Sequence, residues 1–158
     1  KSNLFKSNDF EFRTIQGGVL VSSKDLSFQP NKWETVTNKS PSPSLLESLK
    51  FAWTVCKQVK SNAIVLANNK KLIGMGAGQP NRLASIKLAI ETAGKNTRGS
   101  VLASDAFFPF EDNILACKEA GIAAVVQPGG SVRDKECINA ANKFGIPMVF
   151  THQRAFLH

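Results

Sequence analysis

The stretch from Val101 to Phe150 decides the fold: VLASDAFFPFEDNILACKEAGIAAVVQPGGSVRDKECINAANKFGIPMVF. Short apolar runs alternate there with segments of helical periodicity, which gives strands at 101–104, 123–126 and 146–150 and helices at 112–120 and 134–144. Strands and amphipathic helices at this spacing indicate parallel β-α-β units with helices on both faces of the sheet. The stretch therefore predicts a three-layer α/β/α sandwich.

Two more helices are predicted before this stretch. Apolar residues recur every three or four positions from residue 45 onward, which predicts a helix running to about Lys60 with Pro43 in its first turn. A second helical pattern spans 83–93 and ends at Gly94, a typical C-cap residue.

A hairpin is predicted between these two helices. Apolar runs at 63–67 and 71–76 flank the turn residues Asn68-Asn69-Lys70, so neighbouring antiparallel strands should make the sheet a mixed one. Farther upstream, QGGVLVSS at 16–23 predicts an isolated strand, followed by a polar and Ser/Pro-rich segment. We therefore expect an N-terminal strand and linker at 1–40 and one α/β unit at 41–158.

Composition narrows the classes of function. The chain has 158 residues, of which 42% are hydrophobic, and 20 Lys and Arg against 12 Asp and Glu give a formal net charge of +8. This charge favours phosphate-bearing or other anionic ligands, but the basic residues are scattered, so we do not expect nucleic acid as a partner. No apolar run approaches the roughly 20 residues that cross a bilayer, so we expect no membrane span.

The three cysteines, Cys56, Cys117 and Cys137, lie far apart in the sequence. This spacing predicts neither a disulfide framework nor a zinc site, and it fits a reducing cytoplasm. With two histidines and no tyrosine, a Cys-His nucleophile pair has little support. The chain opens at Lys1 without Met or the apolar core of a signal peptide, and we expect a fragment.

The loops at the carboxyl ends of the strands should carry the ligand chemistry. In GAGQPNR, residues 76–82, alternating glycines precede a helix with Arg82 in its first turn, which would let amides and a guanidinium approach an anion. Alternating glycines at a strand end also indicate tight packing. The sequence leaves both explanations open.

Three aromatic residues stand in the next loop, DAFFPFEDN at 105–113. They predict either an apolar plug beneath the helix or an aromatic wall for a flat heteroaromatic ligand, with Asp112 and Asn113 at its rim. In the loop QPGGS, Ser131 is expected to cap the helix that follows. Phe156, near the end of the chain, favours a docked terminus over an unstructured tail.

Five ordered motifs resemble one family: FAWTVCKQVKSNAIVLANN, IGMGAGQPNR, LASDAFFPFEDN, VVQPGGSVRD and the terminal TxxRxFxH. They are similar to the C-terminal part of the aminoimidazole carboxamide ribonucleotide (AICAR) formyltransferase domain of bifunctional purine biosynthesis proteins, from about residue 17 to 158. The resemblance implies an enzyme that also carries an N-terminal inosine monophosphate (IMP) cyclohydrolase domain. It further implies a cytidine deaminase-like fold, of which this chain would be mainly the second subdomain.

The resemblance also implies a reaction. In the family, an amine of AICAR attacks the formyl carbon of 10-formyltetrahydrofolate, and this amine is a weak nucleophile because its lone pair is conjugated with the carboxamide. A base, tight positioning and oxyanion donors are needed, and the family uses a Lys-His pair within a Lys-His-x-Asn-Pro motif. No Lys-His dipeptide occurs in this sequence. We therefore expect no catalytic residue in this chain and no activity from it alone.

What the chain matches is the binding half of the family's site. The positions that match the substrate pocket are Asn62, Arg82, Phe107, Arg154, Phe156 and His158. Asp112 and Asn113 match the contacts of the folate ring. The implied ligands are thus AICAR and a reduced folate.

The family binds a potassium ion near this pocket and forms homodimers. Ser61 and Asp105 match two of the potassium positions, whereas Val59 and Ala63 replace hydroxyl residues found in some members, so the ion stays open. The alternative to a fragment of this enzyme is a stand-alone nucleotide- or folate-binding module that has kept the pocket without the chemistry. An upstream Lys-His-x-Asn-Pro segment would separate the two.

Overall fold

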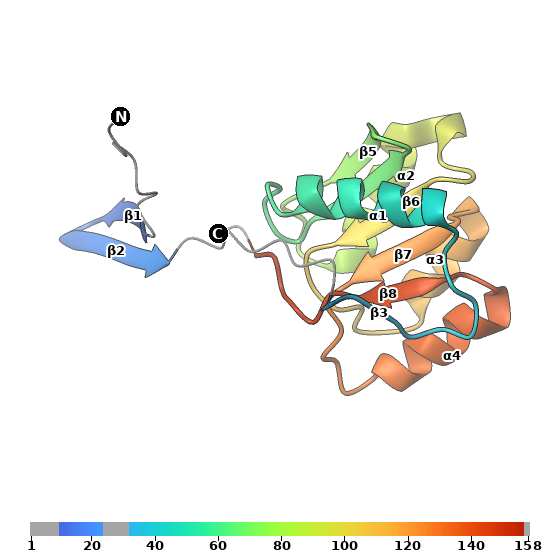
Figure 1. The fold of residues 1–158 in the computed structure, drawn as a ribbon. Coiled ribbons are helices and arrows are strands. Elements are labelled where there is room, and N and C mark those ends of the chain that lie inside the picture. The colour runs from blue at the N-terminus through green and yellow to red at the C-terminus, as the bar shows by residue number, and fades with distance from the viewer. Residues whose placement is uncertain (1–9, 24–31, 157–158) are drawn as a thin grey trace, which may run out of the picture.

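Six strands form one mixed sheet in the order β3-β8-β7-β6-β4-β5 (Figure 1). The computed structural model describes residues 10–23 and 32–156. The strands of this sheet are β3 (Glu34–Thr35), β4 (Ile64–Asn68), β5 (Lys71–Gly76), β6 (Val101–Ser104), β7 (Ala124–Gln127) and β8 (Met148–Phe150). β6, β7 and β8 run parallel, and the other neighbours pair antiparallel. The predicted hairpin is β4–β5, and the mixed sheet is confirmed.

Helices cover both faces of this sheet, as the alternating pattern predicts. They are α1 (Pro43–Cys56), α2 (Arg82–Ala93), α3 (Asp112–Ala120) and α4 (Asp134–Phe144), with a short 3-10 helix, η2 (Gly94–Asn96), after α2. α1 lies on one face, and α2, α3 and α4 pack on the other. The three-layer sandwich is therefore confirmed.

Two predicted elements are longer than the observed ones. α1 ends at Cys56 and not near Lys60, because the Gln58 amide bonds back to the Val55 carbonyl and the chain tightens into turns. The last strand begins at Met148 and not at residue 146, because the Ile146 amide bonds to the Ala141 carbonyl and still belongs to the end of α4.

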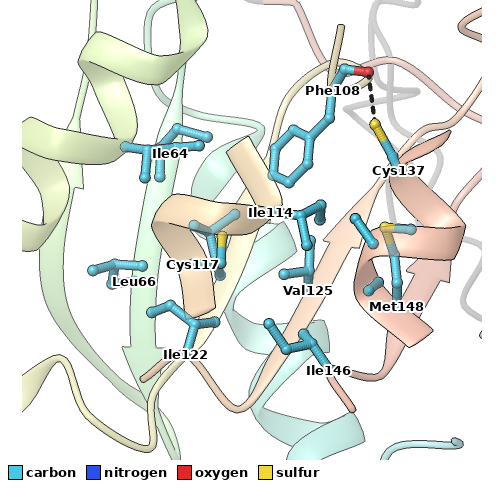
Figure 2. Close-up of a cluster of buried hydrophobic side chains, with 14 of the residues drawn as sticks. Ile64, Leu66, Phe108, Ile114, Cys117, Ile122, Val125, Cys137, Ile146 and Met148 are labelled. Atoms are coloured by element: carbon cyan, nitrogen blue, oxygen red, sulfur yellow. Dashed lines mark hydrogen bonds between the residues drawn. The ribbon is translucent and has the colours of Figure 1, made fainter. Parts of the chain in front are cut away.

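Alternate strand residues supply two separate cores. Ile64, Leu66 and Leu102 face α2, α3 and α4, where Phe108 and Ile114 complete a large apolar cluster (Figure 2). The intervening strand residues point the other way and pack against Leu49, Trp53 and Cys56 of α1. Burial on both faces explains why these strands read as continuous apolar runs.

The segment around β3 was not predicted as a strand. Glu34 and Thr35 pair with Phe150 and Val149 of β8, and the Thr37 hydroxyl accepts the Met148 amide at 2.8 Å. A two-residue strand gives no periodic signal, which explains the omission. The division of the chain at residue 40 stays a prediction.

A separate two-stranded sheet precedes this unit. β1 (Phe10–Ile15) pairs antiparallel with β2 (Gly18–Ser23), and only the second of these strands was predicted. Phe12, Leu20 and Val21 are each more than half exposed on it. Across the described residues, none of the helices has the length and apolarity that a membrane crossing requires.

Candidate functional site

The predicted site residues gather where β6, β7 and β8 reach their carboxyl ends. Arg82, in the first turn of α2, forms the centre of one group there, and Arg154, after β8, forms the centre of another. His158 lies outside the described residues, so its place stays a prediction.

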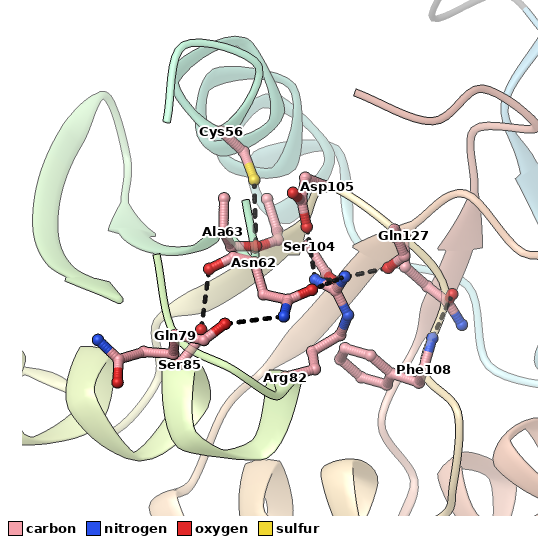
Figure 3. A network of polar contacts seen from close by, with 12 residues as sticks. Cys56, Asn62, Ala63, Gln79, Arg82, Ser85, Ser104, Asp105, Phe108 and Gln127 are labelled. Carbon is pink, nitrogen blue, oxygen red and sulfur yellow. Dashed lines mark hydrogen bonds and ion pairs between the residues drawn. The ribbon is translucent and has the colours of Figure 1, made fainter. Parts of the chain in front are cut away.

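The Arg82 side chain is buried, and oxygen atoms surround its guanidinium (Figure 3). Nη1 donates to Asp105 Oδ1 at 2.5 Å and to Ser104 Oγ at 2.9 Å, and Nη2 donates to Asn62 Oδ1 at 2.9 Å. Asp105 is fully buried, so this pair neutralises a carboxylate that would otherwise be charged inside the protein. Arg82 thus links α2 to the loop after β6.

Asn62 extends this network toward the loop after β5. Its Nδ2 donates to the Gln79 carbonyl at 2.9 Å, and its own carbonyl accepts the Ser85 hydroxyl at 2.8 Å. The predicted residues Asn62, Arg82 and Asp105 are therefore brought together, with Ser104 as an additional member.

Tight packing explains two of the alternating glycines, Gly74 and Gly76. A Cβ atom on Gly74 would clash with the Ala89 carbonyl, and one on Gly76 would clash with the Ser85 carbonyl, so both positions let α2 lie directly on β5. The N-terminus of α2 already has a cap, because Asn81 Oδ1 accepts the Ala84 amide at 2.9 Å. Packing therefore accounts for Gly74 and Gly76, whereas Gly78 has a φ of 66° and no neighbour closer than 4.0 Å to a Cβ atom placed there, and anion binding at this helix stays a prediction.

Arg154 is held in a different way, by aromatic rings. Its guanidinium carbon lies 5.1 Å from the ring centre of Phe107 and 5.8 Å from that of Phe156, within the range of cation–π contacts. All three residues keep exposed surface. We call these residues, Phe107, Arg154 and Phe156, the aromatic platform.

The DAFFPFEDN loop contains the predicted apolar plug, whereas its role as a wall for a ligand stays a prediction. Phe108 is fully buried in the core beneath the loop, as a plug, whereas Phe110 is half exposed beneath the Arg133 guanidinium. Asp112 is exposed at the start of α3, whereas Asn113 is buried and donates to the Phe110 carbonyl at 2.9 Å. Only one of the two predicted folate contacts therefore presents its side chain to solvent.

The C-terminal segment is docked as far as the described residues extend. The Ala155 amide donates to the Asp105 carbonyl at 2.9 Å, which ties the segment to the loop after β6. A small hollow of about 230 Å³ opens beside Arg154 and His152, above the loop Pro128-Gly129-Gly130. His152 Nε2 contacts Glu34 Oε2 at 2.8 Å at its outer side.

Comparison with known proteins identifies the family to which the chain belongs. A family model described as the AICARFT/IMPCHase bienzyme matches residues 1–92. The chain belongs to the AICARFT/IMPCHase bienzyme family. The match includes Asn62 and Arg82, whereas the aromatic platform lies beyond the matched range.

Relatives carry the similarity through the rest of the chain. A bifunctional purine biosynthesis protein PurH of Prochlorococcus marinus (strain MIT 9215) is 50% identical over 159 residues, which cover 100% of this chain and 31% of that protein. The protein of the same name in Dictyostelium discoideum is 50% identical over 94% of this chain and 28% of its own length. The chain thus spans less than a third of these bienzyme relatives.

Solved structures give a much weaker likeness. Form 1 of Acinetobacter baumannii RibD matches with a TM-score of 0.45 and 17% identity over 66% of this chain and 33% of that chain. A similarity at this level carries no argument about this bienzyme family member.

Two buried oxygens could be ligands of the potassium ion that the resemblance to the family implies. Ser61 Oγ and Asp105 Oδ2 are buried without a hydrogen-bond partner among the described residues. Hydroxyl and carboxylate oxygens of this kind suit a hard cation, although the apolar side chains of Val59 and Ala63 supply no such atoms. These two oxygens are of the type that the expected ion would use, and the ion itself stays a prediction. For a zinc-type site, the described residues contain no group of three or more His, Cys, Asp or Glu side chains that could hold a metal.

The cysteine thiols take no part in the site. All three are free and buried, and burial raises the pKa of Cys117 to about 12 and that of Cys137 to about 11. Burial also raises the pKa of Cys56 well above its usual value, with the nearby Asp105 carboxylate adding to the effect. Thiols held in this protonated form are poor nucleophiles.

Two buried polar residues of the site were missed by the sequence reasoning. Ser104 donates its hydroxyl to the Ala106 carbonyl and accepts from Arg82, and Gln127 accepts amides from two loops. Each is a polar residue at the end of an otherwise apolar strand, which is the signal that could have found them. Ser131, expected to cap α4, instead accepts the Arg133 amide at 3.1 Å in the turn just before that helix.

Proposed function

We propose that this chain is a C-terminal piece of an AICAR formyltransferase that acts in purine biosynthesis, and that it supplies the nucleotide- and folate-binding surface of that enzyme. Family membership supports the enzyme class. The resemblance of the ordered motifs in the sequence supports the C-terminal position. The observation that carries the binding role is the aromatic platform, where an exposed guanidinium contacts two rings beside a buried polar network.

The platform suits a planar imidazole carboxamide. Phe107 and Phe156 offer ring surfaces, and the guanidinium of Arg154 offers donors to a carbonyl or phosphate oxygen. Asn62 lies at the partly exposed edge of the Arg82 network, so we place the carboxamide side of the nucleotide there. Arg82 itself is occupied by Asp105, and its part in binding is to hold Asn62 in place.

Asp112 and Asn113 are the folate residues of the proposal. Asp112 is exposed at the first turn of α3, beside a hollow of about 490 Å³ between α3 and α4. Its Oδ1 accepts from Asn113 Nδ2 at 2.7 Å, which fixes the carboxylate. A fixed carboxylate can accept hydrogen bonds from the ring nitrogens of a reduced folate.

The chain contributes positioning and not proton transfer. In the reaction, a bond forms between the AICAR amine and the formyl carbon, and the bond from that carbon to the folate nitrogen breaks. The departing folate nitrogen takes up a proton, and the amine loses one. The Lys-His pair that would take this proton has no counterpart in the sequence of this chain. Holding the two reactants in the correct geometry is itself worth several kcal/mol of the barrier.

The proposal also includes a bound ion, an oligomeric state and a cellular location. We place a potassium ion against Ser61 and Asp105, where it would screen charge beside the pocket, and we expect no zinc. A homodimer would complete the site in the whole protein. Three free thiols support a cytoplasmic location.

The proposal is tested by calorimetric titration of this chain with AICAR and, separately, with tetrahydrofolate. Ribose 5-phosphate is the matched control ligand, because it keeps the phosphate and ribose of AICAR but lacks the imidazole carboxamide. We expect AICAR to bind at least 10-fold more tightly than this control. Equal affinity for both, or no heat with AICAR, would overturn the proposed site.

A further inference from the structure

Gln127 is a fully buried amide at the end of an apolar strand. It is the last residue of β7, the strand that lies between β6 and β8 in the sheet. Its side chain is 0% exposed, and a buried amide is costly unless its polar atoms have partners. The hydrogen-bond partners of the Gln127 amide therefore indicate the role of this residue.

One oxygen of Gln127 serves two loops of the site. Oε1 accepts the Phe108 amide at 3.1 Å from the loop after β6 (Figure 3). It also accepts the Gly129 amide at 3.3 Å from the loop after β7. The other end of the amide, Nε2, contacts Met148 Sδ at 3.5 Å in β8. A single side chain thus contacts the loop after β6, the loop after β7 and the first residue of β8.

No backbone hydrogen bond between described residues joins 105–111 directly to 128–133. The Gln127 oxygen is therefore a direct link between the two backbones, and the segment after β8 is an indirect one, because its His152 and Ala155 amides bond to the Pro128 and Asp105 carbonyls. These loops also contact each other through the exposed stacking of Arg133 on Phe110, at 4.9 Å.

Each loop also has an anchor of its own beside this link. Gly129 has a φ of 71°, and a Cβ atom there would clash with the Phe150 ring, so this loop lies directly on β8. The Phe108 ring is buried in the core, and its neighbour Phe107 forms one side of the aromatic platform. The Gln127 oxygen, which accepts the amides next to Phe107 and at Gly129 itself, therefore contributes directly to the position of Phe107 relative to Gly129.

We propose that Gln127 is a positioning residue, whose amide oxygen fixes the aromatic platform relative to the glycine loop without touching the ligand. If this oxygen is lost, two buried amides are left without an acceptor, and one loop or both must shift to satisfy them. Ligand affinity should then fall, although every residue of the platform is still present. The affinity part rests on the proposed function, whereas the link between the loops does not.

The first test measures the link directly, by amide hydrogen exchange in NMR spectra. Gln127→Met keeps the length of the side chain but removes the acceptor. We expect exchange at the Phe108 and Gly129 amides to become at least 10-fold faster, beyond any change at the Val125 amide, which bonds to the Pro147 carbonyl. Met148→Leu is the matched control, because it removes only the sulfur contact and should change both amides by less than 3-fold.

A second variant covers the case in which Gln127→Met does not fold. Gln127→Asn keeps an amide but is one methylene shorter, so its oxygen should no longer reach both donors, and the same loss of protection is expected. Unchanged protection at Phe108 and Gly129 in a folded variant would overturn the proposal.

The affinity for AICAR is then measured on the same proteins. We expect a Kd at least 10-fold higher for Gln127→Met and a Kd within 2-fold of the original for Met148→Leu. Lost protection with unchanged affinity would refute the positioning role. If the unsubstituted chain does not bind AICAR, the proposed function fails, and the exchange rates still decide whether Gln127 links the loops.

Discussion

Two arginines define two regions of the site that differ in almost every physical respect. Arg82 is 7% exposed, and its guanidinium contacts a carboxylate, a hydroxyl and an amide oxygen. Arg154 is exposed, and its guanidinium makes cation–π contacts with the rings of Phe107 and Phe156. The sequence predicted the same nucleotide-binding role for both.

This difference indicates that Arg82 stabilises the fold, whereas Arg154 is available to bind a ligand. A guanidinium that already neutralises a buried carboxylate is part of the architecture, because removing it would leave a charge in the core. A guanidinium supported only by ring faces keeps its hydrogen-bond donors for a ligand. Substitutions at the two arginines should therefore change different quantities.

The largest expected effect is the loss of stability in Arg82→Ala. This change leaves the fully buried Asp105 carboxylate without a countercharge, so we expect the free energy of unfolding to fall by about 3–5 kcal/mol. Urea denaturation measures the change, and Arg154→Ala serves as the matched control. A loss below about 1 kcal/mol would show that Arg82 is not a structural residue.

The next effect is on binding, in Arg154→Ala. The stability should change by no more than about 1 kcal/mol, because the contacts that are lost are exposed. Binding of AICAR should weaken by about 1.5–3 kcal/mol, since a donor group in the pocket is removed. Calorimetric titration checks this, and an affinity equal to that of the unsubstituted chain would remove Arg154 from the site.

A third prediction concerns how Arg82 is held in place. Gly76→Ala inserts a methyl group against the Ser85 carbonyl, and Ser85 in turn bonds to Asn62. α2 must move away from β5, at a cost of about 1–3 kcal/mol in unfolding free energy. Gly99→Ala, where nothing lies within 4 Å of the new atom, controls for the loss of glycine, although its φ of 81° adds some strain. Equal thermal stability of the Gly76→Ala protein and the original would contradict the packing explanation.

The smallest effect comes from the buried thiols and depends on pH. The pKa of Cys117 is raised to about 12, above the roughly 8.5 of an unfolded thiol, so the folded state holds its proton more tightly. This stability is present below about pH 8.5 and is lost as the pH rises toward the folded value.

Urea unfolding at pH 8, 9 and 10 measures this dependence. Cys117→Ala should flatten the decline of the unfolding free energy above pH 8.5 by up to about 1.4 kcal/mol for each pH unit. Identical slopes in the two proteins would show that the Cys117 thiol is not held protonated by the fold.

The sequence predicted the sheet and its helices well because their apolar residues have a clear period. α3 and α4 have the bounds that were predicted, and Gly94 ends α2 as a C-cap. β1 and β3 were missed, the first because its strand is mixed in polarity and the second because two residues show no period.

The candidate site was predicted less completely, for a physical reason. Residue type shows that Arg82 and Arg154 are cations, but burial and partners depend on contacts between distant segments, such as Arg82 with Asp105. Gln127 was missed because its role depends on amides from two loops that only the fold brings together. Whether the platform binds AICAR stays a prediction.

The most direct test of the central claim combines binding and turnover in one sample. The chain is titrated with AICAR, 10-formyltetrahydrofolate is then added, and formylated product is measured against a sample without protein. We predict binding of AICAR and no product above that background, because the residues of this chain position the reactants and supply no base. Product formation by this chain alone, or the absence of AICAR binding, would contradict the account.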